Sequence, residues 1–427
     1  YSYDGLSKDI LPKLYDTSGS KLLQNQEDHF LEKNINLKID GIEAEKDAAN
    51  TAKIQIIINN EEEVEVTDLK IDDMETKISR ISTQNKKTYV EASVIPVRYY
   101  DSYKISEIQY LYRNEEQTQE IEGKIELQFY KELYTYEDWE AIEIGTYQNY
   151  RLMSDIDFQN KEHINYDVTI GRLEAEGEKK YLKNIELNVK EQSSGFISLI
   201  KNGMKNIGFE NITIRAEGSG NRVGVIAVNT APMENVEFKN IKIHGAGYNQ
   251  VGCIGYNSGE KTVNIQIQDI LCEGENYTGG FIGYAEGNPM DKVNANNIKI
   301  ESSKNYIGGV FGYIHTVKDY QIQINGIIGQ SMIVHGNDYV GGIAGDVGGG
   351  AVTILQYSKV SDSEINGHSY VGGVAGRVYE NNHNESNNVK VRGTGEKIGG
   401  LIGESGNAKD LSVRNSTIEG ITANSKY

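Results

Sequence analysis

Seven tyrosines recur at two fixed places in the C-terminal half of the chain, and their type and spacing suit a binding surface. Four of them precede a glycine-rich phrase in successive repeats: Tyr277, Tyr306, Tyr339 and Tyr370. Three more follow that phrase: Tyr256, Tyr284 and Tyr313. If the repeats stack as parallel strands, equivalent positions lie ~4.8 Å apart, so each set should form an aromatic ladder. We call the set of four the first ladder and the set of three the second ladder.

Two roles are open to these ladders. Their rings can stabilise the flank of the stack, or they can bind sugar rings or an extended peptide, because Tyr supplies amphipathic contact area at low entropic cost. For the second role the predicted ligand-binding residues are the first ladder, Tyr277, Tyr306, Tyr339 and Tyr370. These residues border an inward-facing phrase, so we expect their side chains to point outward.

Carboxylates are the other candidate for chemistry. Asp155 and Asp157 alternate on a predicted strand and would share a face, within reach of a calcium ion or a sugar. The alternative is a solvated strand edge. Asp346 and Glu404 follow the glycine-rich phrase but do not belong to adjacent repeats, and no Lys or Arg cluster stands opposite such a pair. The sequence therefore predicts no catalytic residue, although enzymes do occur among proteins with stacked repeats of this kind.

Histidine and cysteine give no sign of a metal site. The seven histidines include no pair at i and i+4, the spacing at which a helix places two histidines on one zinc ion. Cys253 occupies an inward apolar position and Cys272 ends an alternating strand, so both are expected to be small buried hydrophobic residues. A disulfide between them would have to join different sides of one repeat. We expect no metal and no cofactor.

Composition excludes several classes of partner. The 427 residues carry 43 Lys and Arg against 62 Asp and Glu, a net charge of −19. Such a balance argues against nucleic acid and against anionic membrane surfaces. No apolar run reaches the ~20 residues that cross a bilayer, so no membrane insertion is expected. The chain begins with Tyr1 and shows no signal peptide, which indicates a mature chain or an excised fragment.

A repeat of about 29 residues organises the C-terminal half. Eight glycines align at spacings of 29, 28, 28, 29, 33, 31 and 27 residues. The two residues after each glycine are apolar and the third is small, and from Tyr277 onward the glycine is doubled. The aligned glycines are Gly195, Gly224, Gly252, Gly280, Gly309, Gly342, Gly373 and Gly400. Because the first three copies lack the doubled glycine, we expect those repeats to differ in shape.

Each repeat also contains an alternating segment that turns at an amide or acid. The turn residues are Asn211, Asn240, Asp269 and Asn297, at spacings of 29, 29 and 28. Alternation of apolar and polar residues predicts strands, and Asn or Asp tolerates the left-handed backbone of a bend. Short strands at this period, without helices, predict one turn of a parallel β-helix, which we expect to be right-handed. Spaced leucines or four strands per repeat, typical of other repeat folds, are absent.

The phrase Tyr339-Val-Gly-Gly-Ile-Ala-Gly345 and its copies resemble the GLUG repeat of Gram-positive surface proteins. The order around it is similar to the repeat region that precedes the catalytic domain of IgA-specific zinc metallopeptidases. On that resemblance the Trp139 helix and the segments 149–158, 171–173 and 182–185 would form the first turns, and the likeness covers residues 134–425. The family's peptidase motif is absent from this sequence, so any protease activity of a parent protein would lie outside it.

The N-terminal part lacks the repeat and has a different strand pattern. Residues 52–58, 64–71, 88–97, 103–112 and 124–130 predict antiparallel strands, so we expect a small β-sandwich, immunoglobulin-like, over residues 41–134. Residues 1–40 show no clear periodicity. A short helix at 135–143, with Thr135 as its N-cap, should plug the open end of the β-helix with Trp139 and Ile142. The β-helix is expected to fill residues 135–427, which makes the protein all-β.

Three functions remain open at this point. The leading hypothesis is a non-catalytic extracellular module of a larger bacterial protein, secreted or attached to the cell wall, which acts as adhesin, stalk or substrate-docking arm and binds a host protein or glycan. Its extracellular placement rests on the family resemblance. The alternatives are a carbohydrate-active enzyme that uses an acidic groove, such as a polysaccharide lyase or glycosidase, and a structural spacer without a ligand.

Overall fold

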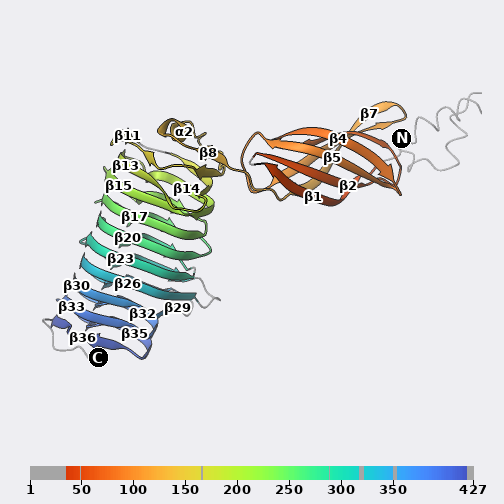
Figure 1. The fold of residues 1–427 in the computed structure, drawn as a ribbon. Coiled ribbons are helices and arrows are strands. Elements are labelled where there is room, and N and C mark those ends of the chain that lie inside the picture. The colour runs from red at the N-terminus through yellow and green to blue at the C-terminus, as the bar shows by residue number, and fades with distance from the viewer. Residues whose placement is uncertain are drawn as a thin grey trace, which may run out of the picture. The chain divides into compact units, whose positions relative to one another are not determined.

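The computed structural model describes residues 35–48, 50–164, 167–287, 289–316, 322–349 and 353–420. The chain divides into two compact units, Tyr1–Leu127 and Gln128–Tyr427, and each is described by itself (Figure 1). Of the segment 1–40, only residues 35–40 are described, and the first strand already begins at Lys38. Apart from one short helix, the regular elements of the described residues are all strands, which confirms the all-β prediction.

The first unit is a pair of small antiparallel sheets, in the strand orders β1-β2-β5-β4 and β3-β6-β7. This is the A-B-E-D and C-F-G arrangement of a constant-type immunoglobulin domain. The hydroxyl of Tyr103, the first residue of β6, donates to the carbonyl of Arg98 (2.9 Å), as in the tyrosine corner of such domains. Its strands are β1 (Lys38–Ala48), β2 (Thr51–Asn59), β3 (Glu65–Ile71), β4 (Met74–Gln84), β5 (Lys87–Pro96), β6 (Tyr103–Tyr112) and β7 (Glu115–Ile125).

One strand prediction in this unit is wrong. The predicted strand 124–130 ends at Ile125, where β7 ends, although Leu127 and Phe129 are still buried on alternate positions. Side-chain burial continues past the last backbone pairing, so apolar alternation alone overestimates the strand. Residues 115–123 of β7 were not expected as a strand either, and the same holds for the whole of β1 and β4. β1 and β4 flank the four-stranded sheet, and most of their residues are exposed or half-buried, which removes the apolar alternation that identifies a strand.

The second unit is a parallel β-helix, as the repeats predict. Equivalent residues of successive turns pair in register: Ile241 with Ile270, Ile270 with Ile298, and Ile298 with Met332. Its strands are β8 (Lys131–Leu133), β9 (Tyr150–Leu152), β10 (Ile156–Asp157), β11 (Glu162–Ile164), β12 (Thr169–Glu174), β13 (Lys180–Val189), β14 (Ser193–Lys205), β15 (Ile207–Ala216), β16 (Gly220–Asn229), β17 (Met233–His244), β18 (Tyr248–Val251), β19 (Ile254–Asn257), β20 (Thr262–Glu273), β21 (Thr278–Gly279), β22 (Ile282–Glu286), β23 (Met290–Glu301), β24 (Ile307–Gly308), β25 (Phe311–Thr316), β26 (Ile322–His335), β27 (Val340–Gly341), β28 (Ala344–Gly349), β29 (Thr353–Gln356), β30 (Lys359–Gly367), β31 (Val371–Gly372), β32 (Ala375–Asn382), β33 (Glu385–Gly393), β34 (Ile398–Gly399), β35 (Ile402–Lys409), β36 (Ser412–Arg414) and β37 (Thr417–Gly420). The pairing of β8 with β9 places the start of this unit before residue 135.

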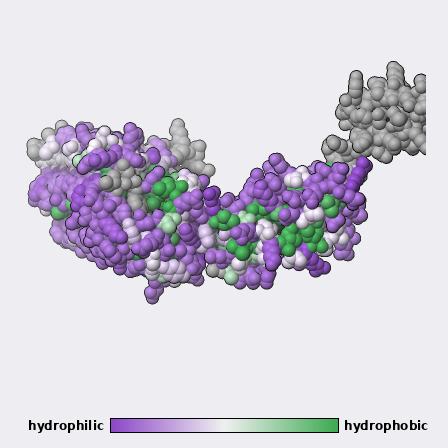
Figure 2. Space-filling model, turned by 90° about the horizontal axis from the view of Figure 1, so that it is seen from above, coloured by the Kyte–Doolittle hydropathy of each residue, from purple (hydrophilic) through white to green (hydrophobic). Residues whose placement is uncertain are grey.

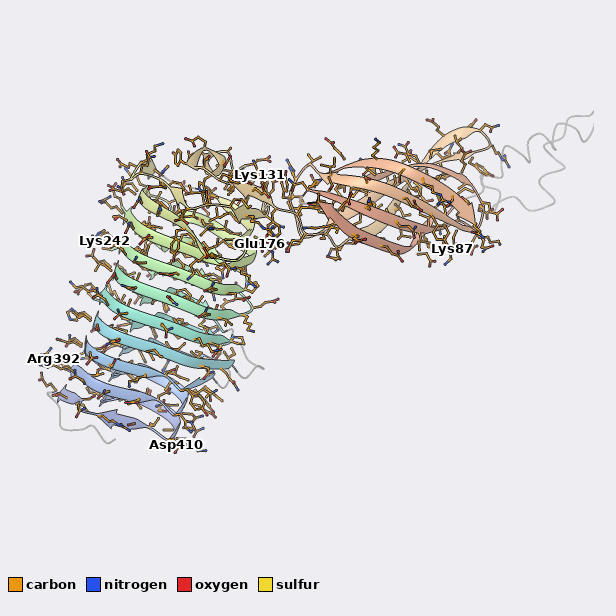
Figure 3. All side chains as sticks on the ribbon, viewed as in Figure 1. Lys87, Lys131, Glu176, Lys242, Arg392 and Asp410 are labelled. Carbon is orange, nitrogen blue, oxygen red and sulfur yellow. The ribbon has the colours of Figure 1, made fainter. Side chains whose placement is uncertain are left out.

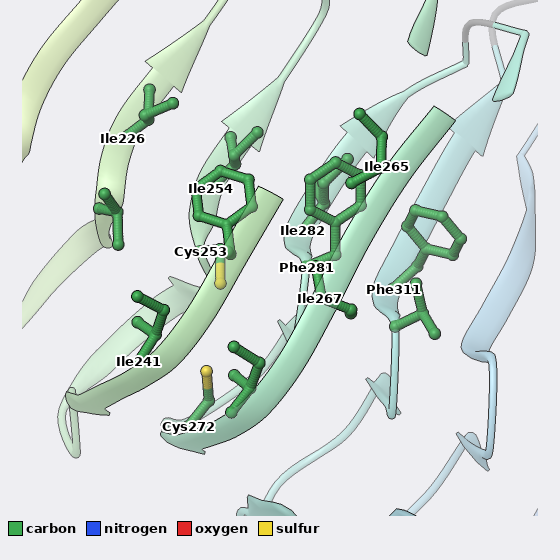
Figure 4. Close-up of a cluster of buried hydrophobic side chains, with 14 of the residues drawn as sticks. Ile226, Ile241, Cys253, Ile254, Ile265, Ile267, Cys272, Phe281, Ile282 and Phe311 are labelled. Atoms are coloured by element: carbon green, nitrogen blue, oxygen red, sulfur yellow. The ribbon is translucent and has the colours of Figure 1, made fainter. Parts of the chain in front are cut away.

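A single apolar core runs along the inside of the β-helix. The two positions after each aligned glycine face it, as Cys253, Phe281, Ile282 and Phe311 show in Figure 4. Charged side chains such as Lys242 and Arg392 project from the outside (Figure 3). The predicted turn residues have positive φ and bond along the axis, for example Asn240 Nδ2 to Asn211 Oδ1 at 2.8 Å. The stack is therefore held by its core and by amide ladders at a bend.

A short helix, α2 (Tyr136–Glu140), covers the N-terminal end of this core. Thr135 caps it, because Asp138 N donates to Thr135 Oγ1 while Asp138 accepts from the Thr135 amide. Trp139 is 1% exposed and stacks on Phe196 at 5.0 Å between ring centroids. No helix among the described residues is long and apolar enough to cross a membrane. The face seen in Figure 2 is mostly hydrophilic, with hydrophobic residues gathered in small patches.

Candidate ligand-binding strip

The first ladder is a continuous stack along one side of the β-helix. The ring centroids of Tyr277 and Tyr306 are 5.1 Å apart, those of Tyr306 and Tyr339 4.9 Å, and those of Tyr339 and Tyr370 4.4 Å. Their planes differ by only 8–20°. These separations follow the ~4.8 Å spacing of the strands, so stacking of the turns itself positions the rings.

The second ladder packs against the first. Tyr284 lies 5.8 Å from Tyr256 and 5.3 Å from Tyr313, and strand pairing holds the three in one column. Edge-to-face contacts join the two columns, with Tyr277 5.4 Å from Tyr284 at 81° and Tyr306 5.3 Å from Tyr313 at 62°. The seven rings thus form one surface, which we call the tyrosine strip.

An extra residue at the corner distinguishes the turns that carry the first ladder. Val251 pairs with Thr278 and Ile254 with Ile282, so three steps along one turn match four along the next. The added residue is the doubled glycine. From the same turn onward the ladder residue adopts a left-handed backbone, with φ of 48°, 65°, 57° and 57° at Tyr277, Tyr306, Tyr339 and Tyr370. The earlier turns therefore differ in shape, as expected from their single glycine.

This corner explains why the third residue of the phrase is glycine. A Cβ on Gly312 would lie 2.5 Å from Tyr277 C, and one on Gly345 would lie 2.5 Å from Tyr306 C. On Gly255, in a turn without the added residue, the nearest atom would be 3.0 Å away. The equivalent residue one turn earlier is Ala227, which already carries a Cβ. A side chain is therefore excluded at the third position, because the backbone of the first-ladder tyrosine in a preceding turn lies too close to it.

The left-handed backbone is unfavourable for tyrosine. It costs roughly 1–2 kcal/mol per residue with a Cβ, and Gly, Asn or Asp usually occupies it. At the opposite bend Asn211 and Asn240 do so. Four bulky aromatic residues in this conformation are held by their neighbours, and ring stacking of ~0.5–1.5 kcal/mol per pair offsets part of the cost.

The rings of the strip are half-buried rather than fully outward. In the first ladder each interior face is covered by the next ring, so ring edges and hydroxyls are what the ladder presents to solvent. Burial raises the pKa of Tyr284, Tyr306 and Tyr339, and burial followed by a hydrogen bond with Glu286 raises the pKa of Tyr256 to about 12. The hydroxyls of these tyrosines therefore stay protonated near neutral pH.

Cations border the strip at both ends. The guanidinium of Arg222 lies 4.4 Å from the Tyr256 centroid, and the Lys397 ammonium lies 4.5 Å from that of Tyr370, whose hydroxyl accepts from it at 3.2 Å. Contacts of this kind contribute about 0.5–1 kcal/mol at exposed sites. Lys397 is also paired with Glu404, and Arg222 donates to Gln250 Oε1, so both cations are held in place beside the terminal rings.

A buried ion pair supports the C-terminal end of the strip. Asp346 follows Tyr313 in the second column and is fully buried, and Arg377 donates to both of its carboxylate oxygens, from Nε at 3.0 Å. Burial raises the pKa of Asp346, although Arg377 acts against this shift. The guanidinium also lies 4.7 Å from the Tyr339 centroid. Sequence reasoning missed this pair, because Glu404 was compared with Asp346 while the residue between them in the column is Arg377.

The predicted carboxylate pair does share one exposed face. Asp155 accepts from the Tyr181 amide (3.0 Å) and from Lys183, and Asp157 accepts from Asn184 Nδ2 at 2.9 Å. Within the described ranges no three His, Cys, Asp or Glu residues come together in a way that could hold a metal ion. Both oxygens of Asp155, and Oδ1 of Asp157, thus accept hydrogen bonds from groups of the protein.

Two further groups contain residue types that often serve in catalysis. Cys253 and Cys272 are both free and fully buried, which raises the pKa of each thiol. His368 lies between an acid and a serine, but Asp338 and Ser369 both contact its Nδ1, at 2.9 and 3.1 Å. A catalytic triad needs the serine on the other ring nitrogen. This cluster therefore links neighbouring turns rather than activating a nucleophile.

Two comparisons with known proteins found no match. The chain matches no protein-family model, and no curated protein is similar to it at a significant level. The resemblance to GLUG repeats and to the repeat region of IgA-specific metallopeptidases thus stays a prediction.

Proposed function

We propose that this chain is a non-catalytic binding module of a larger bacterial protein, placed outside the cell, in which the β-helix presents the tyrosine strip to a host protein or glycan. The observation that carries the proposal is the strip itself. Seven tyrosines are aligned over successive turns, and four of them occupy a backbone conformation that smaller residues would adopt at lower cost. Backbone strain of this kind clusters at functional sites, so its repetition at four equivalent positions supports a function for these side chains.

The chemistry of the strip narrows the ligand. Since stacked rings cover one another, a ligand meets ring edges and a row of hydroxyls at strand spacing, with Arg222 at one end and Lys397 at the other. Such a surface favours a linear ligand with regularly spaced hydrogen-bonding groups, either an oligosaccharide or an extended peptide. The GLUG-like phrase supports the extracellular placement, and binding at the strip would act in adhesion or in docking of a substrate for another part of the polypeptide.

The test is binding by the purified chain to a panel of glycans and host proteins, followed by the double substitution Tyr306→Asn and Tyr339→Asn. Asn tolerates the left-handed backbone, so the change removes the middle of the first ladder without adding strain. Each binding residue of this type contributes more than ~1 kcal/mol, so affinity should fall about 30-fold. Tyr357→Asn is the matched control, because Tyr357 also has positive φ (50°), stacks on His383 and lies outside the strip.

Other outcomes decide between the alternatives. Retained affinity in the double variant would assign the strip to structure alone. No ligand in the panel would favour a spacer. Release of reducing ends from acidic or neutral polysaccharides would favour a carbohydrate-active enzyme. Zinc-dependent cleavage of IgA by the chain would contradict the proposal that the chain is non-catalytic.

A further inference from the structure

Tyr339 and Tyr370 are the closest neighbours in the first ladder. Their ring centroids lie 4.4 Å apart and their planes differ by 20°, whereas the other stacked pairs of this ladder are 4.9 and 5.1 Å apart. The hydroxyls of Tyr339 and Tyr370 are hydrogen-bonded to each other. The ring carbons beside each hydroxyl therefore lie over their counterparts in the other ring, and these are the carbons at which two tyrosine side chains couple when they are oxidised.

The backbone keeps these two tyrosines next to each other. Val340 N donates to Tyr370 O at 3.0 Å, and Val340 pairs with Val371 in parallel register. Paired strands lie ~4.8 Å apart, so the side chains of Tyr339 and Tyr370 start from neighbouring strands at that spacing. Both rings are half-buried, with their edges and hydroxyls toward solvent. Rotation about side-chain bonds can thus bring the rings together without a change in the pairing of the turns, and an oxidant can reach them from outside.

We infer that Tyr339 and Tyr370 are a site of oxidative cross-linking, at which a haem peroxidase with hydrogen peroxide joins the two rings as dityrosine. Each phenol loses one electron to the oxidant and one proton to water, which leaves two phenoxyl radicals. The radicals couple through a carbon–carbon bond between the carbons ortho to the hydroxyls, and the hydrogens on those two carbons move to the oxygens through water. In total two electrons and two protons leave the protein and reduce one molecule of hydrogen peroxide to two of water.

The rest of the tyrosine strip directs oxidation to this pair. Ring contacts of 4.4–5.8 Å join all seven tyrosines. A radical formed on one ring can therefore pass to the next, because neighbouring rings are chemically identical and in contact, and it is consumed where two radicals are held closest. The new bond closes a loop of 31 residues and ties two successive turns together covalently. This reaction needs no ligand on the strip, so the inference does not rest on the proposed function.

The test is oxidation of the purified chain, at low concentration, by a haem peroxidase and hydrogen peroxide. Covalent dimers are removed under denaturing conditions, and the monomer is measured for dityrosine fluorescence and digested with trypsin. Lys359 lies between Tyr339 and Tyr370, so trypsin places the two tyrosines on separate peptides. We expect these two peptides to be linked, with a combined mass lower by two hydrogen atoms, and fragmentation to place the bond at the two tyrosines.

Phenylalanine variants separate the effect of the hydroxyl from that of the ring. Tyr339→Phe and Tyr370→Phe keep a stacking ring at each position but cannot form a phenoxyl radical, so each should lose the linked peptides. Tyr357→Phe is the matched control and should keep them, because Tyr357 is 58% exposed and stacks on His383 outside the strip. Circular dichroism checks that each variant keeps the parent fold.

Three results would overturn the inference. The first is oxidation of the parent that yields no dityrosine, and the second is dityrosine confined to covalent dimers. The third is an unchanged yield of the linked peptides in Tyr339→Phe, since the bond would then join other residues.

Discussion

Gly312→Ala is the substitution that most directly tests how the corner creates the tyrosine strip. The added Cβ would lie 2.5 Å from Gly283 O, 2.5 Å from Tyr277 C and 2.6 Å from Thr278 N. All three are backbone atoms, so no rotamer change can relieve the contacts. Overpacking of this kind costs about 1–3 kcal/mol, and backbone contacts favour the upper end of that range. At ~2–4 °C per kcal/mol, the melting temperature should fall by roughly 5–10 °C.

Gly255→Ala is the matched control. It lies in the same column, in a turn without the added corner residue, and its Cβ would meet Ala227 O at 3.0 Å and Gln250 O at 3.2 Å. Small shifts accommodate such contacts, so the expected cost is under ~1 kcal/mol. Thermal melts give the stability difference, and near-ultraviolet circular dichroism reports whether the tyrosines keep their packing. Equal melting temperatures and equal tyrosine signals in the two variants would refute the argument that the left-handed tyrosine backbone requires glycine.

Three further predictions concern the core, the cap and the hydroxyls. Ile282→Asp places a carboxylate in a fully buried position and should cost several kcal/mol in thermal or denaturant unfolding, so an unchanged melting temperature would contradict the register. Thr135→Ala should cost about 1 kcal/mol by removing the N-cap. Hydrogen bonds from the amides of Tyr134 and Thr135 lower the pKa of Asp138 in the folded protein. The ionised carboxylate therefore contributes its full share to the free energy of unfolding above the ordinary pKa near 3.9, and this share is lost as the pH falls through the lower pKa of the folded state. Melting temperatures of Asp138→Asn measured in acid should not show this loss. Finally, because burial raises the pKa of Tyr306 and Tyr339 above the ordinary value, the contribution of these two residues to affinity, measured as the difference between the parent and the Tyr306→Asn, Tyr339→Asn variant, should not fall between pH 7 and about 10.

The β-helix is predictable from the sequence because its information is local and repeated. The pattern of one turn shows which positions are buried, and the same pattern recurs at each of the eight aligned glycines. The bend residues Asn211 and Asn240 are recognisable for the same reason, since few other side chains adopt positive φ without strain. The cap at Thr135 is equally local, because its partner Asp138 is three residues away.

The candidate site is less predictable because it depends on which turn lies next to which. The doubled glycine is visible in the sequence, but the left-handed backbone that it gives Tyr277 is not. The Asp346–Arg377 pair joins equivalent positions of adjacent turns, so the signal that could have found it is the residue after the small corner position in each copy. In the first unit, β1 and β4 lack alternation, because strands at the margin of a sheet bury only part of one face.

The number of turns that contain the corner insertion also sets the length of the first ladder of the tyrosine strip. Each turn from Tyr277 to Tyr370 contains the insertion and adds one ring to the first ladder, whereas the turn of Val251 lacks it and adds none to that ladder. Duplication or loss of a single repeat would lengthen or shorten the surface by one step and leave every other ring in place, because each turn contacts only its neighbours. If the strip binds a linear polymer, as proposed above, the number of repeats would set the length of polymer bound without a change in the groups that contact each unit.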